Sequence, residues 1–248
     1  MILSLSLMLL GIFTLIYIGI VLFVGVKVIS KYFSIKDKTF LYAGIGFIGV
    51  AFPWSGVAIN FISIVFFDVV PSMEIHFFFH GGMGGAFLFF WIMAILNLSG
   101  IQPEKREKYL IFIGVVAFIV EIVYLSLIFY DTDILGTLLN EIQMDYAPFN
   151  EVYLLTQLII VLISGFWLAS KSLKSENDRI KIKGRLLLFG FILFPIASTL
   201  EVLVPFVPII IIGRLLALIS LIFTYGGLIL PKWMEKLFLK KEKNYKKD

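Results

Sequence analysis

Long apolar runs separated by short polar segments are the dominant pattern of this chain. A helix of about 20 apolar residues is long enough to cross the roughly 30 Å hydrocarbon layer of a bilayer. Seven runs meet this length, so the pattern predicts an all-α, polytopic membrane protein: a seven-transmembrane helix bundle. The predicted spans are Ile2–Val28, Thr39–Phe66, His76–Leu98, Tyr109–Tyr130, Phe149–Ser170, Gly184–Val204 and Pro208–Leu230.

Two of these spans have features of their own. The second span is the longest, and we expect it to tilt or to kink at Pro53, because proline interrupts the helical hydrogen bonds. The first span has no basic segment before it and no small-residue cleavage pattern after it. We therefore expect it to be a retained helix and not a cleaved signal peptide.

Composition agrees with the membrane class. Hydrophobic residues make up 60% of the chain, whereas soluble domains are usually about half apolar. We expect a transmembrane domain over residues 1–231 and a basic cytoplasmic tail over residues 232–248, with no separate soluble domain. The start of the tail fits a short interfacial helix whose lysines contact anionic lipids, and it also fits a disordered, solubilising tail.

The charges alternate between the two sides of the predicted bundle. Every lysine and arginine except Arg214 lies in the first, third and fifth connections, beside them, or in the tail. The second and fourth connections carry only acidic charges. Because cytoplasmic loops are enriched in lysine and arginine, this distribution predicts an outer amino terminus and a cytoplasmic carboxyl terminus. It also assigns the net charge of +4 to a multi-pass protein of the cell membrane and not to a nucleic-acid-binding protein.

Ionisable and amide side chains inside the spans are the main candidates for function, because their burial in a membrane is costly. Helical rise places six of them roughly 5–14 Å inside the outer ends of their spans. We expect them to line a polar cavity that opens to the outside and binds a ligand. The alternative is that Arg214 forms a structural ion pair with Glu121 or Glu201. The predicted ligand-binding residues are Arg214, Glu121, Glu201, His80, Gln157 and Asn60.

His76 and His80 are four residues apart, so they share one helix face. Such a pair suits a metal ion or a haem, with Glu121 or Glu201 as a further metal ligand. Two alternatives stay open: hydrogen-bonded histidines at the membrane interface, and a pH-sensitive switch. Four glycines follow the pair, at positions 81, 82, 84 and 85.

Several familiar chemistries are excluded. The chain has no cysteine, so it forms no disulfide and has no thiolate metal ligand. The literal dinucleotide pattern Gly44-x-Gly46-x-x-Gly49 lies inside a span without a preceding strand, so we interpret its glycines as helix-packing residues. No lysine lies in the last span, which excludes a retinal Schiff base there. No histidine follows His80, so a serine nucleophile has no base downstream.

The last two spans resemble the seven-helix membrane sensor modules that precede histidine kinases in archaea and bacteria. The similar residues are Lys183-Gly184-Arg185, Glu201, Arg214, Gly227, Pro231 and Trp233. The resemblance implies sensing outside and signalling inside the cell. Only a short lysine-rich tail follows Trp233, so a separate cytoplasmic signalling protein would have to dock on the basic loops. The chain lacks the acid-arginine-aromatic triplet and the Asn-Pro-x-x-Tyr pattern of the large animal receptor class.

Three functions follow from these observations. The first is a receptor-like sensor that binds its ligand in the outer half of the bundle. The second is a small-solute or proton-coupled transporter that uses the same carboxylates. The third is a metal- or haem-binding membrane enzyme that uses His76 and His80. We assign no catalytic residue, and no cofactor beyond that metal or haem.

Overall fold

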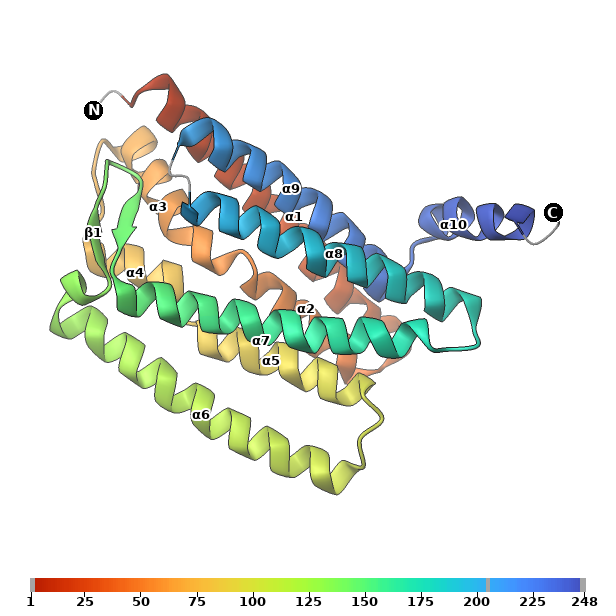
Figure 1. Cartoon of the computed structure of the whole chain (residues 1–248). Helices are drawn as coiled ribbons and strands as arrows, with labels where there is room; N and C mark the ends of the chain where they lie inside the picture. Colours follow the sequence, from red (N-terminus) through yellow and green to blue (C-terminus); the bar gives the residue numbers. More distant parts are fainter. Residues whose placement is uncertain (1–2, 204–205, 246–248) are drawn as a thin grey trace.

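The computed structural model describes residues 3–203 and 206–245, and these residues are mostly helical, which confirms the predicted all-α class. The long helices lie side by side, with the start of α1 at the end that carries a small β-hairpin and the last helix projecting from the opposite end (Figure 1). The elements are α1 (Leu5–Ile35), α2 (Lys38–Gly49), α3 (Phe52–Phe67), α4 (Met73–Gly81), α5 (Gly84–Leu98), α6 (Pro103–Tyr130), η1 (Thr132–Ile134), β1 (Gly136–Leu138), β2 (Met144–Tyr146), α7 (Pro148–Leu173), α8 (Asp178–Leu203), α9 (Val207–Ile229) and α10 (Lys232–Tyr245).

The helices have the length and composition of membrane spans. Five segments of the described chain pass this test, and α2 with α3 adds a sixth if the bent pair is one span. Helix α8 occupies the position of the expected sixth span but is not among these segments, and Val204, where that span was expected to end, lies outside the described residues. The protein therefore has membrane-spanning character, whereas the count of seven spans stays a prediction.

The expected second span is bent by 51° between α2 and α3. Pro53 lies in the first turn of α3, where a missing backbone N–H breaks no helical hydrogen bond. The bend falls at residues 50 and 51, just before this proline, which confirms the kink expected near Pro53.

Glycines allow the first helices to pack closely. A Cβ atom on Gly44 would lie 2.8 Å from the carbonyl oxygen of Gly25, and one on Gly46 would lie 2.8 Å from backbone atoms of Trp91. The backbones of α1, α2 and α5 therefore approach more closely than larger side chains would permit.

Helix α6 lies at the edge of the bundle (Figure 1). In the most apolar 18-residue stretch of α6, only 11% is buried, a smaller share than in any of the other four candidate spans. Tyr124 and Ile128 are its buried residues. An apolar pocket of about 460 Å³ lies between α5 and α6, with Glu107 as its one charged residue. Most of α6 is thus available to lipid.

The predicted fourth connection forms η1 and an antiparallel hairpin of β1 and β2. Ile142, at the tip of the hairpin, is fully buried in a cluster with Leu10 of α1, Phe61 of α3 and Ile210 of α9. Leu135, before β1, is buried against residues of α4, α6 and α7. The hairpin therefore covers one end of the bundle.

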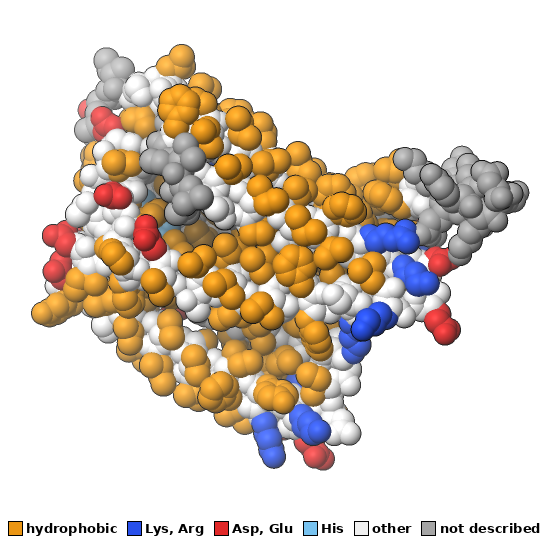
Figure 2. All heavy atoms as spheres, in the orientation of Figure 1, with side chains coloured by type: hydrophobic (Ala, Val, Ile, Leu, Met, Phe, Trp, Pro, Cys, Tyr) orange, Lys and Arg blue, Asp and Glu red, His pale blue; other side chains and the backbone are white. Residues whose placement is uncertain are grey.

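The charged side chains separate along the bundle. On the face in Figure 2, lysines and arginines gather at the end that carries α10. The opposite end, which carries the hairpin, shows acidic side chains and no lysine or arginine on this face. The basic and the acidic connections, which alternate along the sequence, therefore lie at opposite ends of the bundle on this face.

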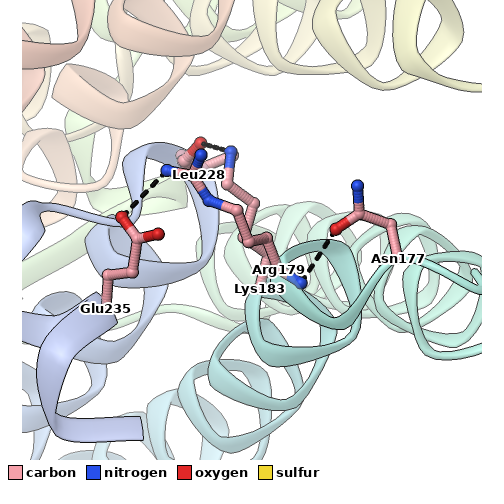
Figure 3. Close-up of polar contacts among 5 residues, drawn as sticks. All are labelled: Asn177, Arg179, Lys183, Leu228 and Glu235. Atoms are coloured by element: carbon pink, nitrogen blue, oxygen red, sulfur yellow. Dashed lines mark hydrogen bonds and ion pairs between the residues drawn. The ribbon is translucent and has the colours of Figure 1, made fainter. Parts of the chain in front are cut away.

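Helix α10 covers Lys232 to Tyr245, and its start packs against the end of the bundle. Met234 is buried with Ile182 and Leu186 of α8. Arg179 and Glu235 form an ion pair, with their nitrogen and oxygen 2.9 Å apart, and Figure 3 shows it beside the bond that Lys183 donates to the Leu228 carbonyl, 3.0 Å long. The start of α10 is therefore tied to α8 and α9, while the contact of the tail with lipid stays a prediction.

The close contact of α2 with α5 makes one prediction about stability. Gly46→Ala should lower the melting temperature, because the added methyl group meets the backbone at Trp91, and overpacking of this kind costs about 1–3 kcal/mol. Gly19→Ala is the matched control, since no atom lies within 4 Å of the added methyl group. Thermal unfolding in detergent measures both variants, and an equal shift would contradict the packing argument.

Candidate functional site

The third expected span, His76–Leu98, is not one continuous helix. It is divided into α4 and α5 around Gly82 and Met83, although together they have the length of one span. A helix break inside a membrane exposes backbone groups that need hydrogen-bond partners, because lipid supplies none. The side chains that meet these groups come from α6 and α7.

Two side chains bond to the two sides of this break. The Tyr153 hydroxyl of α7 donates to the carbonyl oxygen of Gly81, at 2.8 Å. The backbone N–H of Gly85, in the first turn of α5, donates to a carboxylate oxygen of Glu121 in α6, also at 2.8 Å. A carboxylate at the start of a helix is further stabilised by the helix dipole. Glu121 thus acts as a cap supplied by a neighbouring helix.

The glycine run makes these contacts sterically feasible. A Cβ atom on Gly84 would lie 2.7 Å from the Tyr153 hydroxyl and from an amide nitrogen of Gln157, and one on Gly85 would lie 2.7 Å from Glu121. The break therefore brings together two predicted ligand-binding residues, Glu121 and Gln157. One oxygen of Glu121 and the amide nitrogen of Gln157 have no hydrogen-bond partner among the described residues.

A pair of stacked tyrosines extends this polar group. The rings of Tyr124 and Tyr153 lie 4.5 Å apart. The Tyr124 hydroxyl donates to the side-chain oxygen of Asn150, at 3.1 Å. All three residues are buried, so the network links α6 to α7 beneath the hairpin.

The two predicted histidines are also buried, with 0% of His76 and 2% of His80 exposed. Their rings stack 5.8 Å apart. The ring of Tyr146 in β2 stacks on His80 at 4.5 Å, and its hydroxyl lies 3.2 Å from Nδ1 of that histidine. On the side of α3, Gly56 leaves room for the His76 ring. The hairpin and α4 are therefore joined directly at His80.

Arg214 is 3% exposed, and its guanidinium lies over the ring of Trp54, 5.8 Å from the ring centre. Tyr17 of α1 and Phe194 of α8 contact the same indole, with ring centres 4.9 and 6.3 Å away. Aromatic faces attract cations, so this cluster stabilises a buried guanidinium. The side chain of Glu201, one of the two expected partners, lies outside the described residues.

These contacts divide the predicted site residues into groups. Trp54 meets Arg214, whereas Gly56 meets His76. Residues two apart on a helix point in nearly opposite directions, so Arg214 and His76 contact opposite sides of α3. Asn60 is fully buried one turn further along the face of Gly56, and its amide has no hydrogen-bond partner among the described residues. A single cavity that contains all of them stays a prediction.

The predicted metal site has no carboxylate in the described part of the chain. No group of three or more His, Asp or Glu side chains there is arranged to hold a metal ion. His76 and His80 therefore lack a third ligand of this kind among these residues, and the side chain of Glu201 is not one of them.

Four aromatic residues were not predicted as site residues. Tyr153 lies four positions before Gln157, so helical spacing could have placed both on one face. No sequence signal could have paired Tyr146 with His80, because 66 positions separate them. Tyr124 lies three positions after Glu121, so the same spacing places these two residues on one face. Trp54 is one of many aromatic residues in apolar runs, which gave no reason to select it.

Comparison with known proteins identifies no relative. No protein-family model matches the chain, and no curated protein or solved structure matches it. The function must therefore be argued from the residues.

The cap on α5 makes a second prediction. Glu121→Leu should leave the Gly85 N–H without an acceptor, and an unsatisfied buried group of this kind costs about 1–3 kcal/mol. We expect faster hydrogen–deuterium exchange at residues 82–87, measured by mass spectrometry. Glu121→Gln is the control, because its amide oxygen still accepts the bond. Equal exchange in both variants would show that the carboxylate does not hold the break.

Proposed function

We propose that this protein is a receptor-like sensor of the cell membrane. Seven spans would carry the amino terminus outside and the carboxyl terminus in the cytoplasm, with an outer polar region that binds the ligand. The predicted contacts are those of Arg214, Glu121, Glu201, His80, Gln157 and Asn60. A separate cytoplasmic protein would receive the signal.

The contact between Tyr146 and His80 carries this proposal. Tyr146 belongs to the hairpin that covers the acidic end of the bundle, and His80 is the penultimate residue of α4. The helix break follows within three residues. A ligand that moves the hairpin would therefore act on a point where the span can bend, and bending there needs the rupture of few hydrogen bonds.

Helix α5 connects the break with the basic end of the bundle. It packs on α2, α6 and α7. Just beyond its end, the carbonyl oxygen of Ser99 accepts a hydrogen bond from the Lys171 ammonium group of α7. Rotation of α5 would change this contact and the basic surface around it. In this proposal the signal is a change in the populations of two positions of α5, which alters the basic surface that the cytoplasmic partner would contact.

The charge distribution supports the proposed orientation. Lysine and arginine gather at the end that carries α10, and the positive-inside rule would place this end in the cytoplasm. The hairpin would then face outside, where a ligand arrives. The basic loops and α10 would face anionic lipids and an acidic surface of the signalling partner.

Coupling across the break gives a third prediction. The chain has no cysteine, so spin labels at Lys36→Cys and Leu98→Cys report only the distance between the inner ends of α1 and α5. Tyr146→Phe should redistribute the measured distances, because it removes one hydrogen bond at His80, worth about 0.5–1.5 kcal/mol. Tyr130→Phe is the control, since Tyr130 is 82% exposed. An unchanged distribution in Tyr146→Phe would refute coupling through this contact.

The bent pair α2–α3 and the two-residue interruption between α4 and α5 favour a second candidate, a small-solute or proton-coupled transporter. Transporters commonly place polar sites at interrupted helices. Gly49 of α2 packs against Phe87 of α5, so the bend in α2–α3 and the break in α4–α5 are neighbours. The carboxylate of Glu121 at the second break would be the proton-binding group.

Counterflow in liposomes distinguishes the two candidates and is the fourth prediction. A sensor should give no saturable exchange of labelled amino acids, sugars or organic anions beyond protein-free liposomes. Saturable exchange that Glu121→Gln abolishes would assign the protein to the transporters, because the amide keeps the hydrogen bond but carries no titratable proton.

A further inference from the structure

Helix α4 carries a row of uncharged donor atoms. Met73, His76 and His80 follow one another at spacings of three and four residues, so they lie along one face of the helix. Phe77, beside this row, belongs to a packed cluster that includes Met73 and Met144. Met144 of β2 thus belongs to the same cluster as Met73 and Phe77 of α4.

The hairpin presents Met144 and Tyr146 on the same side. Side chains two residues apart point to the same face of a strand, and Met144 is 6% exposed. The ring of Tyr146 stacks on His80. Met144 is therefore held on the side of the hairpin that faces α4.

Three imidazole nitrogens at this site make no hydrogen bond of standard length within the part of the chain that the structure describes, although the backbones of Gly56 and Pro53 lie near the two rings. Among the described residues, the two ring nitrogens of His76 and the Nε2 atom of His80 have no hydrogen-bond partner. Both side chains are almost completely buried. Buried polar atoms without partners are destabilising by about 1–3 kcal/mol each. A ligand that accepts electron-pair donation from these atoms would offset that cost.

Tyr146 prepares His80 for such a role. When Nδ1 carries the ring proton and donates it to the Tyr146 hydroxyl, Nε2 keeps its lone pair for a ligand. Metal-binding histidines are commonly oriented in this way by a partner on the second nitrogen. The 3.2 Å distance between Nδ1 and the hydroxyl oxygen fits this arrangement.

We infer that Met73, Met144, His76 and His80 form a binding site for a soft monovalent cation, Cu(I). Thioether sulfur and imidazole nitrogen are ligands that favour copper in this state. The set contains no carboxylate, which disfavours hard divalent cations. The inference goes beyond the proposed function, because binding requires neither a hinge motion nor a cytoplasmic partner.

The acidic end of the bundle gives a cation an approach to this site. The connection that contains the hairpin carries Asp131, Asp133, Glu141 and Asp145 and no basic residue. Clustered charges of one sign raise the local concentration of the opposite ion. The cation would thus reach α4 along the hairpin.

The test is a competition for Cu(I), kept reduced with ascorbate under argon, between the purified full chain in detergent and the coloured chelator bicinchoninate. We expect one Cu(I) per chain to leave the chelator, and X-ray absorption to record both sulfur and nitrogen neighbours. Failure to withdraw copper from the chelator, or a spectrum with nitrogen and oxygen neighbours alone, would overturn the inference.

Variants identify the ligands. Met144→Leu and His80→Gln should each weaken Cu(I) binding by about tenfold or more, the scale on which metal sites respond to altered ligation. Met234→Leu is the matched control, because Met234 is equally buried but lies in α10. If Met144→Leu does not give a monodisperse protein, Met73→Leu takes its place. Unchanged affinity in the methionine and histidine variants would identify adventitious binding and refute the site.

Discussion

A broken helix in a bilayer has to find hydrogen-bond partners for its backbone within the protein, and this constraint organises the centre of the molecule. Tyr153 and Glu121 meet it from two neighbouring helices, on either side of the glycine run. Small residues are essential here, because a side chain on Gly84 or Gly85 would occupy the space of the capping groups. The polar residues of α6 and α7 thus have a structural reason to be where they are, independent of any ligand.

The same constraint explains what the sequence could and could not predict. Apolar runs predicted the helices well, because crossing a membrane demands both length and low polarity. The bend near Pro53 was predictable, since a proline inside a helical pattern usually ends or kinks the helix just before it. The break before α5 was not predicted, although its glycines are plain in the sequence. Apolar residues continue on both sides of it, and a pattern of hydropathy is insensitive to one interrupted turn.

The candidate site shows a similar division. Burial cost drew attention to Glu121, Gln157 and His80, and each of them contacts a neighbouring element: Glu121 and Gln157 lie against α5, and His80 lies against β2. It could not predict which helix faces meet, because that depends on packing between distant segments. Arg214 illustrates the difference: its contact with the face of Trp54 was not predicted, and its pairing with a carboxylate stays a prediction.

The shallow burial of α6 has a consequence for assembly. Helices that enter the bilayer independently associate afterwards through specific contacts. With Tyr124 and Ile128 as its buried residues, α6 would gain little from apolar packing as it joins the others. The hydrogen bond between the Glu121 carboxylate of α6 and the Gly85 N–H of α5 would then form late in assembly. Until then the Gly85 N–H at the break between α4 and α5 would lack its hydrogen-bond acceptor. A newly made chain would therefore pass through a stage in which this span bends easily at the break.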